Sequence, residues 1–233
     1  MKIHRFKKVS STNDAAKEIA LLRNLQSKFL IFQEKCPAFF HEMKGESDFV
    51  VVADEQTKGK GRMGREWLSP IGGLYLSIVT KKNPLLPLIS GVAVANSLKN
   101  FGLNPVLKWP NDVIVGNKKI SGILIECLDD FAIVGIGINI NKTPLETATS
   151  IKDETGDIPR DVVLNNVLKS FEKYSEKNVL DEYKKLSSTI GMFVKIKTLK
   201  GDIEGKAIDV DEHGRLILES GEIIVSGDVI HLR

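Results

Sequence analysis

The sequence KGKGRMGREW at residues 58–67 constrains the fold more than any other segment of this chain. Four cations and three glycines fall within its first eight residues, and almost no apolar side chain is present that could join a hydrophobic core. Glycine lets backbone N–H groups approach a ligand closely, and lysine and arginine supply positive charge. The segment therefore predicts an exposed loop that wraps an anion, and the alternative is a solvated basic hairpin tip.

The spacing of these glycines also fits the pattern Gly-x-Gly-x-x-Gly at residues 59–64. The dinucleotide-binding version of that pattern requires a strand before it and a helix after it. An apolar run at 49–53 does precede it, but Ser69-Pro70 and a second strand-like run at 73–79 follow it. A Rossmann fold is therefore not expected.

A second signal is Lys108, which lies in the otherwise apolar run at 106–109. A lysine among apolar residues is costly unless it is paired or faces a ligand, and the alternative is a lysine that reaches solvent at a strand edge. Asn111 and Asp112 follow Pro110 and could form a turn or offer oxygen ligands to a divalent cation.

Polar residues also end two later apolar runs, Glu126 after 120–125 and Asn139 after 131–138. The chain offers no Ser-His-Asp or Cys-His arrangement that could act as a nucleophile with its base. A cationic glycine loop, a lysine in a strand and several oxygen or amide groups at strand ends fit nucleotide-phosphate chemistry better.

Hydrophobic periodicity predicts an α+β fold with a mixed, mainly antiparallel sheet and flanking helices. In residues 131–140, Gly135, Gly137 and Asn139 share one face, which predicts that another group approaches that face closely. Residues 27–47 are irregular and are expected to form a long loop or an insertion. Strands are expected at 49–53, 73–79, 106–109, 113–115, 120–126 and 131–140, and helices starting after 10–14 and at 86–101 and 161–186.

The hydrophobic pattern changes near Gly191, after which short β-branched runs alternate with glycine-containing turns. This pattern is typical of a small β-barrel. The sequence therefore predicts two domains, with residues 1–187 carrying the site and residues 188–233 forming the barrel.

Composition narrows the functional classes. Lys+Arg 33 against Asp+Glu 30 gives a net charge of +3, so electrostatic binding must come from a local patch. No apolar run approaches the roughly 20 residues of a membrane span, and no signal peptide is recognisable. The two cysteines and four histidines are scattered without metal-ligand spacing, which favours a reducing cytoplasm and no structural zinc.

Several motifs together resemble biotin protein ligases, the biotin–[acetyl-CoA-carboxylase] ligases, from about residue 9 to 141. The β-rich tail is similar to the SH3-like C-terminal domain of that family. The usual family pattern Gly-Arg-Gly-Arg-x-Gly-Arg-x-Trp has Lys60 here in place of its first arginine, which keeps the charge but loses the planar guanidinium. The motifs occur in family order: Ser11-Thr12-Asn13, Gln56, Gly59–Trp67, Ser69-Pro70, Gly72-Gly73-Leu74, Lys108–Asp112, Lys119–Glu126 and Gly135–Asn139.

The resemblance implies a two-step reaction in which biotin and ATP give biotinyl-5′-AMP, and a lysine of a biotin carboxyl carrier protein then takes the biotinyl group. It implies catalytic roles for Lys108 and Arg62, with Mg²⁺ carried by ATP and no assigned protein ligands. The implied biotin-binding residues are Ser11, Thr12, Asn13, Gln56, Lys60, Gly61, Arg62, Lys108 and Gly122. The implied ATP-binding residues are Arg62, Arg65, Trp67, Lys108, Asn111 and Asn139.

Only about ten residues precede Ser11, so the DNA-binding domain of many bacterial members is not expected, and a ligase without repressor activity is. Homodimers are common in the family. Two alternatives remain open. The first is a lipoate–protein ligase, which has a related architecture and a different acid. The second is a nucleic-acid-binding module, although the small net charge and the lack of an aromatic row beside the basic loop argue against it.

Overall fold

The computed structural model describes residues 1–32, 48–129, 131–175, 178–198 and 201–232. Seven strands form the main sheet in the spatial order β1-β2-β3-β7-β6-β5-β4. β1 and β2 are parallel and the other neighbours are antiparallel, which confirms the expected mixed, mainly antiparallel sheet. The strands are β1 (Lys2–Val9), β2 (Phe49–Gln56), β3 (Leu74–Lys81), β4 (Val106–Lys108), β5 (Asp112–Val115), β6 (Lys118–Leu128) and β7 (Phe131–Ile138).

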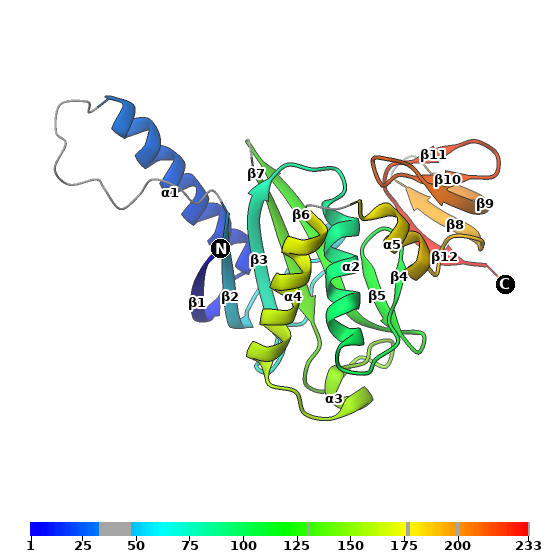
Figure 1. Ribbon diagram of the computed structural model, residues 1–233, viewed down its shortest axis with the longest axis horizontal. Helices are drawn as coiled ribbons and strands as arrows, with labels where there is room; N and C mark the ends of the chain where they lie inside the picture. The colour runs from blue at the N-terminus through cyan, green and yellow to red at the C-terminus, as the bar shows by residue number, and fades with distance from the viewer. Residues whose placement is uncertain (33–47, 130, 176–177, 199–200, 233) are drawn as a thin grey trace.

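Helices cover both faces of this sheet (Figure 1). α2 (Leu86–Lys99) and α4 (Arg160–Ser175) pack side by side on one face, with α5 (Leu180–Leu186) beside α2. α1 (Thr12–Phe32) packs on β2, β3 and β7, and α3 (Ile151–Thr155) is a short helix after β7. No described helix is long and apolar enough to cross a membrane.

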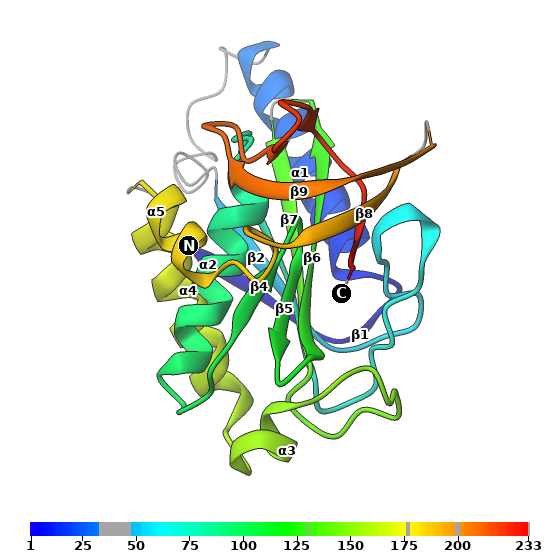
Figure 2. The same cartoon turned by 90° about the vertical axis from the view of Figure 1, so that its right-hand side faces the viewer.

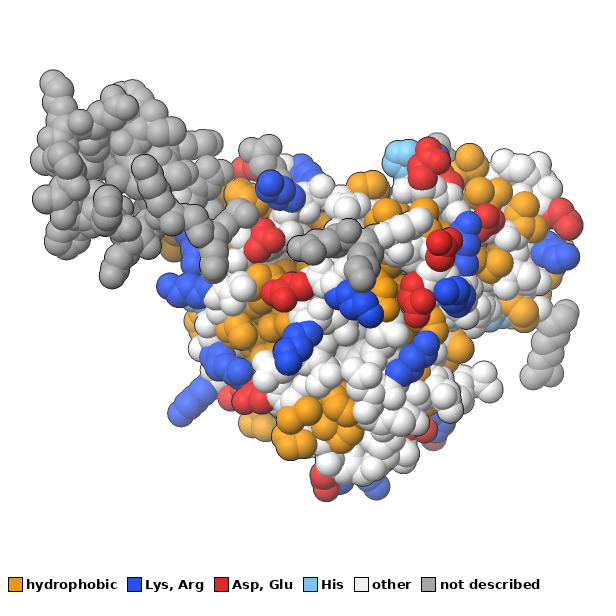
Figure 3. Space-filling model, in the orientation of Figure 1, with side chains coloured by type: hydrophobic (Ala, Val, Ile, Leu, Met, Phe, Trp, Pro, Cys, Tyr) orange, Lys and Arg blue, Asp and Glu red, His pale blue; other side chains and the backbone are white. Residues whose placement is uncertain are grey.

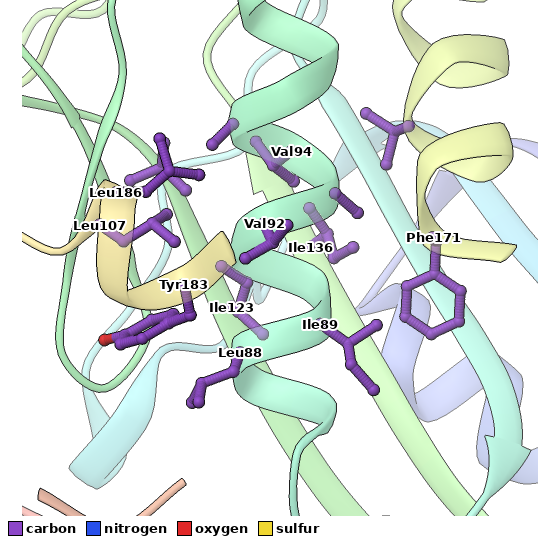
Figure 4. Close-up of a cluster of buried hydrophobic side chains, with 14 of the residues drawn as sticks. Leu88, Ile89, Val92, Val94, Leu107, Ile123, Ile136, Phe171, Tyr183 and Leu186 are labelled. Carbon is purple, nitrogen blue, oxygen red and sulfur yellow. The ribbon is translucent and has the colours of Figure 1, made fainter. Parts of the chain in front are cut away.

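Alternation along the strands divides the core into two layers. In β2, Val50 and Val52 belong to the large cluster under α2, whereas Phe49 and Val51 pack with Ala16 of α1. Figure 4 shows the large cluster, in which aliphatic side chains of α2 gather with those of the sheet. Full burial of one such side chain contributes roughly 1.5–3 kcal/mol, so these layers hold the helices against the sheet.

The C-terminal strands form a separate five-stranded antiparallel sheet in the order β11-β10-β9-β8-β12. In Figure 2 its strands β8 and β9 cross in front of β5, β6 and β7. The indole N–H of Trp109 donates to the carbonyl of Gly214 at 3.0 Å and joins the two sheets. The strands are β8 (Phe193–Thr198), β9 (Gly201–Val210), β10 (Leu216–Leu218), β11 (Ile223–Ile224) and β12 (Asp228–His231).

Three expectations about single elements need correction. Residues 161–186 are two helices instead of one, and the side chain of Asn178 accepts the N–H of Leu180 where α5 begins. Residues 27–32 continue α1, because neither glycine nor proline interrupts residues 12–32; the rest of the expected loop, 33–47, lies outside the described residues. The edge strand β1 was not predicted, because four of its eight residues are lysine or arginine and its apolar residues do not alternate with polar ones.

Candidate active site

A cavity of about 220 Å³ lies on the face of the main sheet that α1 covers. The start of α1, the loop after β2, the strands β4 to β7 and the first residues of β12 all contribute to its lining. The predicted site residues in the lining are Ser11, Thr12, Asn13, Gln56, Lys60, Gly61, Arg62, Arg65, Trp67, Lys108, Asn111 and Gly122.

Strand register explains why these distant segments meet. Lys108 is paired with Asp112 across β4 and β5, Asp112 with Gly122, and Gly122 with Gly137. Partners in antiparallel strands share one face of the sheet, so these residues form a row across the floor of the cavity. The lysine and the aspartate stand at one end of the row, and the glycines leave the other end open.

Trp67 lies over that open end. A Cβ atom at Gly137 would come within 3.0 Å of the indole ring, and one at Gly122 would touch it at 3.0 Å. On the same face of β7, a Cβ atom at Gly135 would lie 2.5 Å from Asn13 Oδ1. These contacts confirm the close approach predicted from the two glycines of β7.

Most of the cations in the cavity lining are paired with carboxylates. Lys60 Nζ lies 2.5 Å from Asp14 Oδ1, Arg65 Nη2 2.8 Å from Asp228 Oδ1, and Lys119 Nζ 2.6 Å from Asp112 Oδ1. Arg62 lies 3.9 Å from the same Asp228 oxygen.

Lys108 is the exception. Its side chain is partly buried and, among the residues that the structure describes, has no carboxylate within 4.0 Å. The positive charge of Lys108 also acts on His231 of β12, whose pKa is lowered chiefly by burial and further by that charge. His231 Nε2 lies 3.3 Å from Thr189 Oγ1, which accepts the backbone N–H of Trp109. The lysine therefore presents an uncompensated positive charge to the cavity.

Arg62 bridges the glycine loop to both sheets. Its Nη1 donates to Asn111 Oδ1 at 2.9 Å and to the carbonyl of Gly227 at 3.2 Å, and Asn111 Nδ2 donates to the carbonyl of Ile123. Burial lowers the pKa of the Arg62 guanidinium, while Asp228 opposes that effect. Arginine keeps its charge in proteins, so this guanidinium is a fixed cation on the cavity wall.

The opposite end of the cavity is lined by neutral polar groups. Gln56 Oε1 accepts the backbone N–H of Thr12 at 2.7 Å, and Gln56 Nε2 donates to Ser69 Oγ at 2.8 Å. Thr12 and Asn13 open α1, as the sequence predicts, but their side chains bond to groups of the sheet rather than capping the helix. The cavity therefore carries the unpaired cation Lys108 at one end, and at the other, its neutral end, it has neutral polar groups beside the Lys60–Asp14 ion pair.

Asn139, a predicted ATP-binding residue, is not part of the lining. Its side-chain Nδ2 donates to the backbone carbonyl of Thr149 at 3.0 Å, and its backbone carbonyl accepts the N–H of Ile151. Asn139 thus braces the segment that leads into α3, next to the floor of the cavity.

The sequence led to no role for the cavity residues Lys119 and Asp228, and it offered Asp112 only as part of a turn or as an oxygen ligand for a divalent cation. Lys119 and Asp112 lie within the motifs quoted above. Strand pairing places both side chains on the cavity face, and that pairing is the feature that could have identified them. Asp228 and Val229 come from the C-terminal sheet, and the local sequence there carries no sign of a site.

Comparisons with known proteins agree with this geometry. Residues 37–141 match the Biotin/lipoate A/B protein ligase family, and residues 189–232 match the Biotin protein ligase C terminal domain. A biotin–[acetyl-CoA-carboxylase] ligase from Mycobacterium tuberculosis is 32% identical over 210 residues, which cover 79% of each chain. The chain belongs to the biotin protein ligase family.

A family member of known structure has the same fold throughout. A biotin protein ligase from Aquifex aeolicus, solved in complex with biotin and ATP, is 33% identical with a TM-score of 0.75, covering 100% of this chain and 99% of that one. The bifunctional ligase/repressor BirA of Bacillus subtilis is 35% identical over 203 residues. The match covers 74% of this chain and only 62% of the length of that BirA.

Proposed function

We propose that this protein is an ATP-dependent biotin protein ligase. It activates biotin to biotinyl-5′-AMP with release of pyrophosphate, and it then transfers the biotinyl group to a lysine of a biotin carboxyl carrier protein. The observation that carries the proposal is the uncompensated charge of Lys108 in a cavity that also holds Arg62 and Arg65.

The first step needs such a charge because it brings two anions together. The biotin carboxylate and the α-phosphate of ATP repel each other by about 4 kcal/mol at ~4 Å and an effective dielectric constant near 20. In the proposed reaction, Lys108 binds the carboxylate and then stabilises the negative charge that develops on the phosphate oxygens. Arg62 and Arg65 hold the phosphates, and Asn111 keeps the Arg62 guanidinium in place.

The neutral end of the cavity suits the head of biotin. A cyclic urea is uncharged and offers two N–H donors and one carbonyl acceptor, so neutral side chains bind it without the desolvation of a charge. Ser11, Thr12 and Gln56 supply such groups at the start of α1 and the end of β2. Lys108 lies at the other end of the cavity, so the carboxylate of biotin reaches Lys108 while the head of biotin stays at the neutral end.

Magnesium enters the proposal only as the counter-ion of ATP. Among the described residues, no group of three or more His, Cys, Asp and Glu side chains could hold a metal ion. Mg²⁺ usually keeps several waters and binds through substrate phosphates plus one or two carboxylates. Asp112 contributes one carboxylate to the lining, and in this structure that carboxylate forms an ion pair with Lys119.

A direct experiment tests the reaction. The protein is incubated with biotin and Mg·ATP, and in parallel with lipoate and Mg·ATP, and the products are analysed by mass spectrometry. We expect biotinyl-AMP in the first mixture and little acyl-AMP in the second. Detection of lipoyl-AMP alone would assign the protein to the lipoate–protein ligases, which the name of the matched Biotin/lipoate A/B protein ligase family also covers.

Transfer is tested in the same mixture by adding a biotin carboxyl carrier domain, which gains the mass of one biotinyl group if the proposal holds. Homodimerisation and a cytoplasmic location stay predictions. The nucleic-acid alternative has little support, because Lys and Arg are interspersed with Asp and Glu over the face seen in Figure 3 and the net charge is only +3. Steeply salt-dependent nucleic-acid binding without ATP consumption would restore it.

A further inference from the structure

A chain of short hydrogen bonds starts from two residues that line the neutral end of the cavity, Thr12 and Asn13, and continues to residues outside the lining. Asn13 Nδ2 donates to Glu126 Oε2 at 2.5 Å, Ser77 Oγ lies 2.6 Å from Asn13 Oδ1, and Ser77 Oγ lies 2.8 Å from Thr12 Oγ1. The four residues come from three elements, α1, β3 and β6, and Thr12, Asn13 and Ser77 are buried.

Glu126 determines the direction of every bond in this chain. A carboxylate only accepts, so the amide nitrogen of Asn13 must face Glu126 and the amide oxygen must face Ser77. The single proton of Ser77 is therefore donated to Asn13. The contact between Ser77 and Thr12 can then be a hydrogen bond only if Thr12 donates.

The proton of Thr12 consequently points into the protein. Its acceptors are Ser77 Oγ at 2.8 Å and Gln56 Oε1 at 3.1 Å. With that proton directed inward, the free lone pair of Thr12 Oγ1 is an acceptor for a ligand N–H in the cavity.

Two further contacts hold the arrangement in place. Lys17 Nζ lies 2.6 Å from Glu126 Oε1, so donors occupy both oxygens of the carboxylate. Asn13 also packs where the side chain of Gly135 would be, which leaves its amide little room to move. The amide of Asn13 thus has one orientation.

We infer that Glu126 is a positioning residue that fixes the hydrogen-bond polarity of the ligand-head pocket, so that Thr12 accepts from a cyclic-urea N–H. The inference rests on the proposed function, in which biotin supplies that N–H. Glu126 itself acts through Asn13 and Ser77.

The test is a polarity swap measured by calorimetric titration of biotin into the full-length protein. In Glu126→Gln the new amide also offers a donor, so Asn13 loses its fixed orientation, and we expect biotin to bind about tenfold more weakly, which corresponds to ~1.4 kcal/mol. In Asn13→Asp two carboxylates face each other, and we again expect weaker binding.

The double variant Asn13→Asp/Glu126→Gln restores the order of donors, because the amide introduced at position 126 donates to the new carboxylate and Ser77 still donates to its other oxygen. We expect biotin affinity within about threefold of the wild type. Glu204→Gln removes the same charge from an exposed ion pair in β9 and serves as the control with unchanged affinity. A double variant as weak as the two single losses combined would overturn the inference.

If Asn13→Asp does not fold, as judged by its melting temperature, a cycle of Glu126→Gln with Ser77→Ala decides. Two residues of one relay lose no more together than the larger single loss, whereas independent residues lose the product. Failure of the proposed function is distinguishable, because the wild type would then bind no biotin. Wild-type binding with unchanged affinity in Glu126→Gln would overturn the inference alone.

Discussion

The side chain of Lys60, in the cavity lining, is held by a carboxylate of the protein itself. Lys60, the position that departs from the family pattern, is hydrogen-bonded to Asp14, and that bond raises the pKa of its ammonium. It therefore points toward α1, whereas Arg62 and Arg65 face the C-terminal sheet. Loss of the planar guanidinium at position 60 accordingly changes the α1 side of the site and not the proposed phosphate side.

His231 gives a prediction about pH. Burial and the charge of Lys108 lower its pKa below the ordinary value near 6.5, so the unfolded chain takes up this proton at a higher pH than the folded one. The stabilising contribution is complete above that value and is lost as the pH falls through the folded pKa. His4, whose pKa is lowered chiefly by burial, acts with the same sign.

We therefore expect His231→Gln to lose less melting temperature than the wild type between about pH 7.5 and 5.5. Thermal unfolding followed by circular dichroism measures this. Identical curves for His231→Gln and the wild type would contradict the assigned environment.

At the scale of elements, the loop between β2 and β3 is closed at its base by backbone bonds, and the side chains of Arg62 and Arg65 near its tip bond to Asn111 and the C-terminal sheet. The N–H of Trp67 donates to the carbonyl of Gly59 at 2.9 Å, and that of Gly61 to the carbonyl of Arg65 at 2.7 Å. The tip residue Met63 is exposed and has a left-handed backbone, with φ of 55°. A hairpin of this kind can close over a bound adenylate and exclude water from it.

We expect biotin with Mg·ATP to slow tryptic cleavage within residues 58–66 by at least about fivefold, as ligand-induced loop closure predicts. Mass spectrometry of the fragments measures the rate at each lysine and arginine. Cleavage after Lys197 in the C-terminal sheet serves as the internal reference. Equal rates in this loop with and without ligands would argue that the loop does not close.

The floor strand β7 gives a second prediction at this scale. Gly137→Ala places a methyl group against the indole of Trp67, and overpacking of this kind costs about 1–3 kcal/mol unless the ring moves. We expect altered tryptophan fluorescence and at least roughly tenfold weaker ATP binding, a loss of about 1.4 kcal/mol. Val134→Ala, on the opposite face of the same strand, should lower stability and leave ATP binding unchanged. Normal ATP affinity in Gly137→Ala would remove Trp67 from the nucleotide site.

The whole molecule behaves as one packed body despite its two sheets. A single hydrophobic cluster includes residues of both sheets, among them Val113 of β5 and Val194 of β8. Asp228 and Val229 of β12 complete the cavity whose floor belongs to the main sheet. The domain boundary at 187/188 stays a prediction. Because the hydrophobic cluster contains residues from both sides of that boundary, cutting the chain there would expose apolar side chains that the cluster buries.

We expect a fragment of residues 1–187 to lose its native melting transition and to expose Trp109, whose indole would no longer find the Gly214 carbonyl. A red-shifted tryptophan emission and increased binding of a hydrophobic dye would report this. The full chain is the reference. A fragment with the native transition would show that the two parts are independent.

Much of this arrangement could be predicted from local sequence. The paired glycines of β7 predicted the face of that strand that Trp67 and Asn13 approach closely, and the apolar runs at 113–115 and 120–126 predicted β5 and β6. The break between α4 and α5 falls in the polar run 175–178, and the expectation of one helix was wrong because it continued the apolar spacing past Tyr174, although neither Lys177 nor Asn178 is apolar. The contribution of Asp228 depends on how the second sheet packs, and no pattern within its own strand reports that contact.

The central claim is that Lys108 supplies the charge that lets two repelling anions react, and biotin-dependent exchange of pyrophosphate into ATP tests it most directly. We predict that Lys108→Ala lowers the exchange rate by about 10²-fold or more, as loss of one charge-stabilising donor does in other enzymes. Lys118→Ala, at an exposed lysine at the start of β6, should exchange at the wild-type rate. An unchanged rate in Lys108→Ala would contradict the claim.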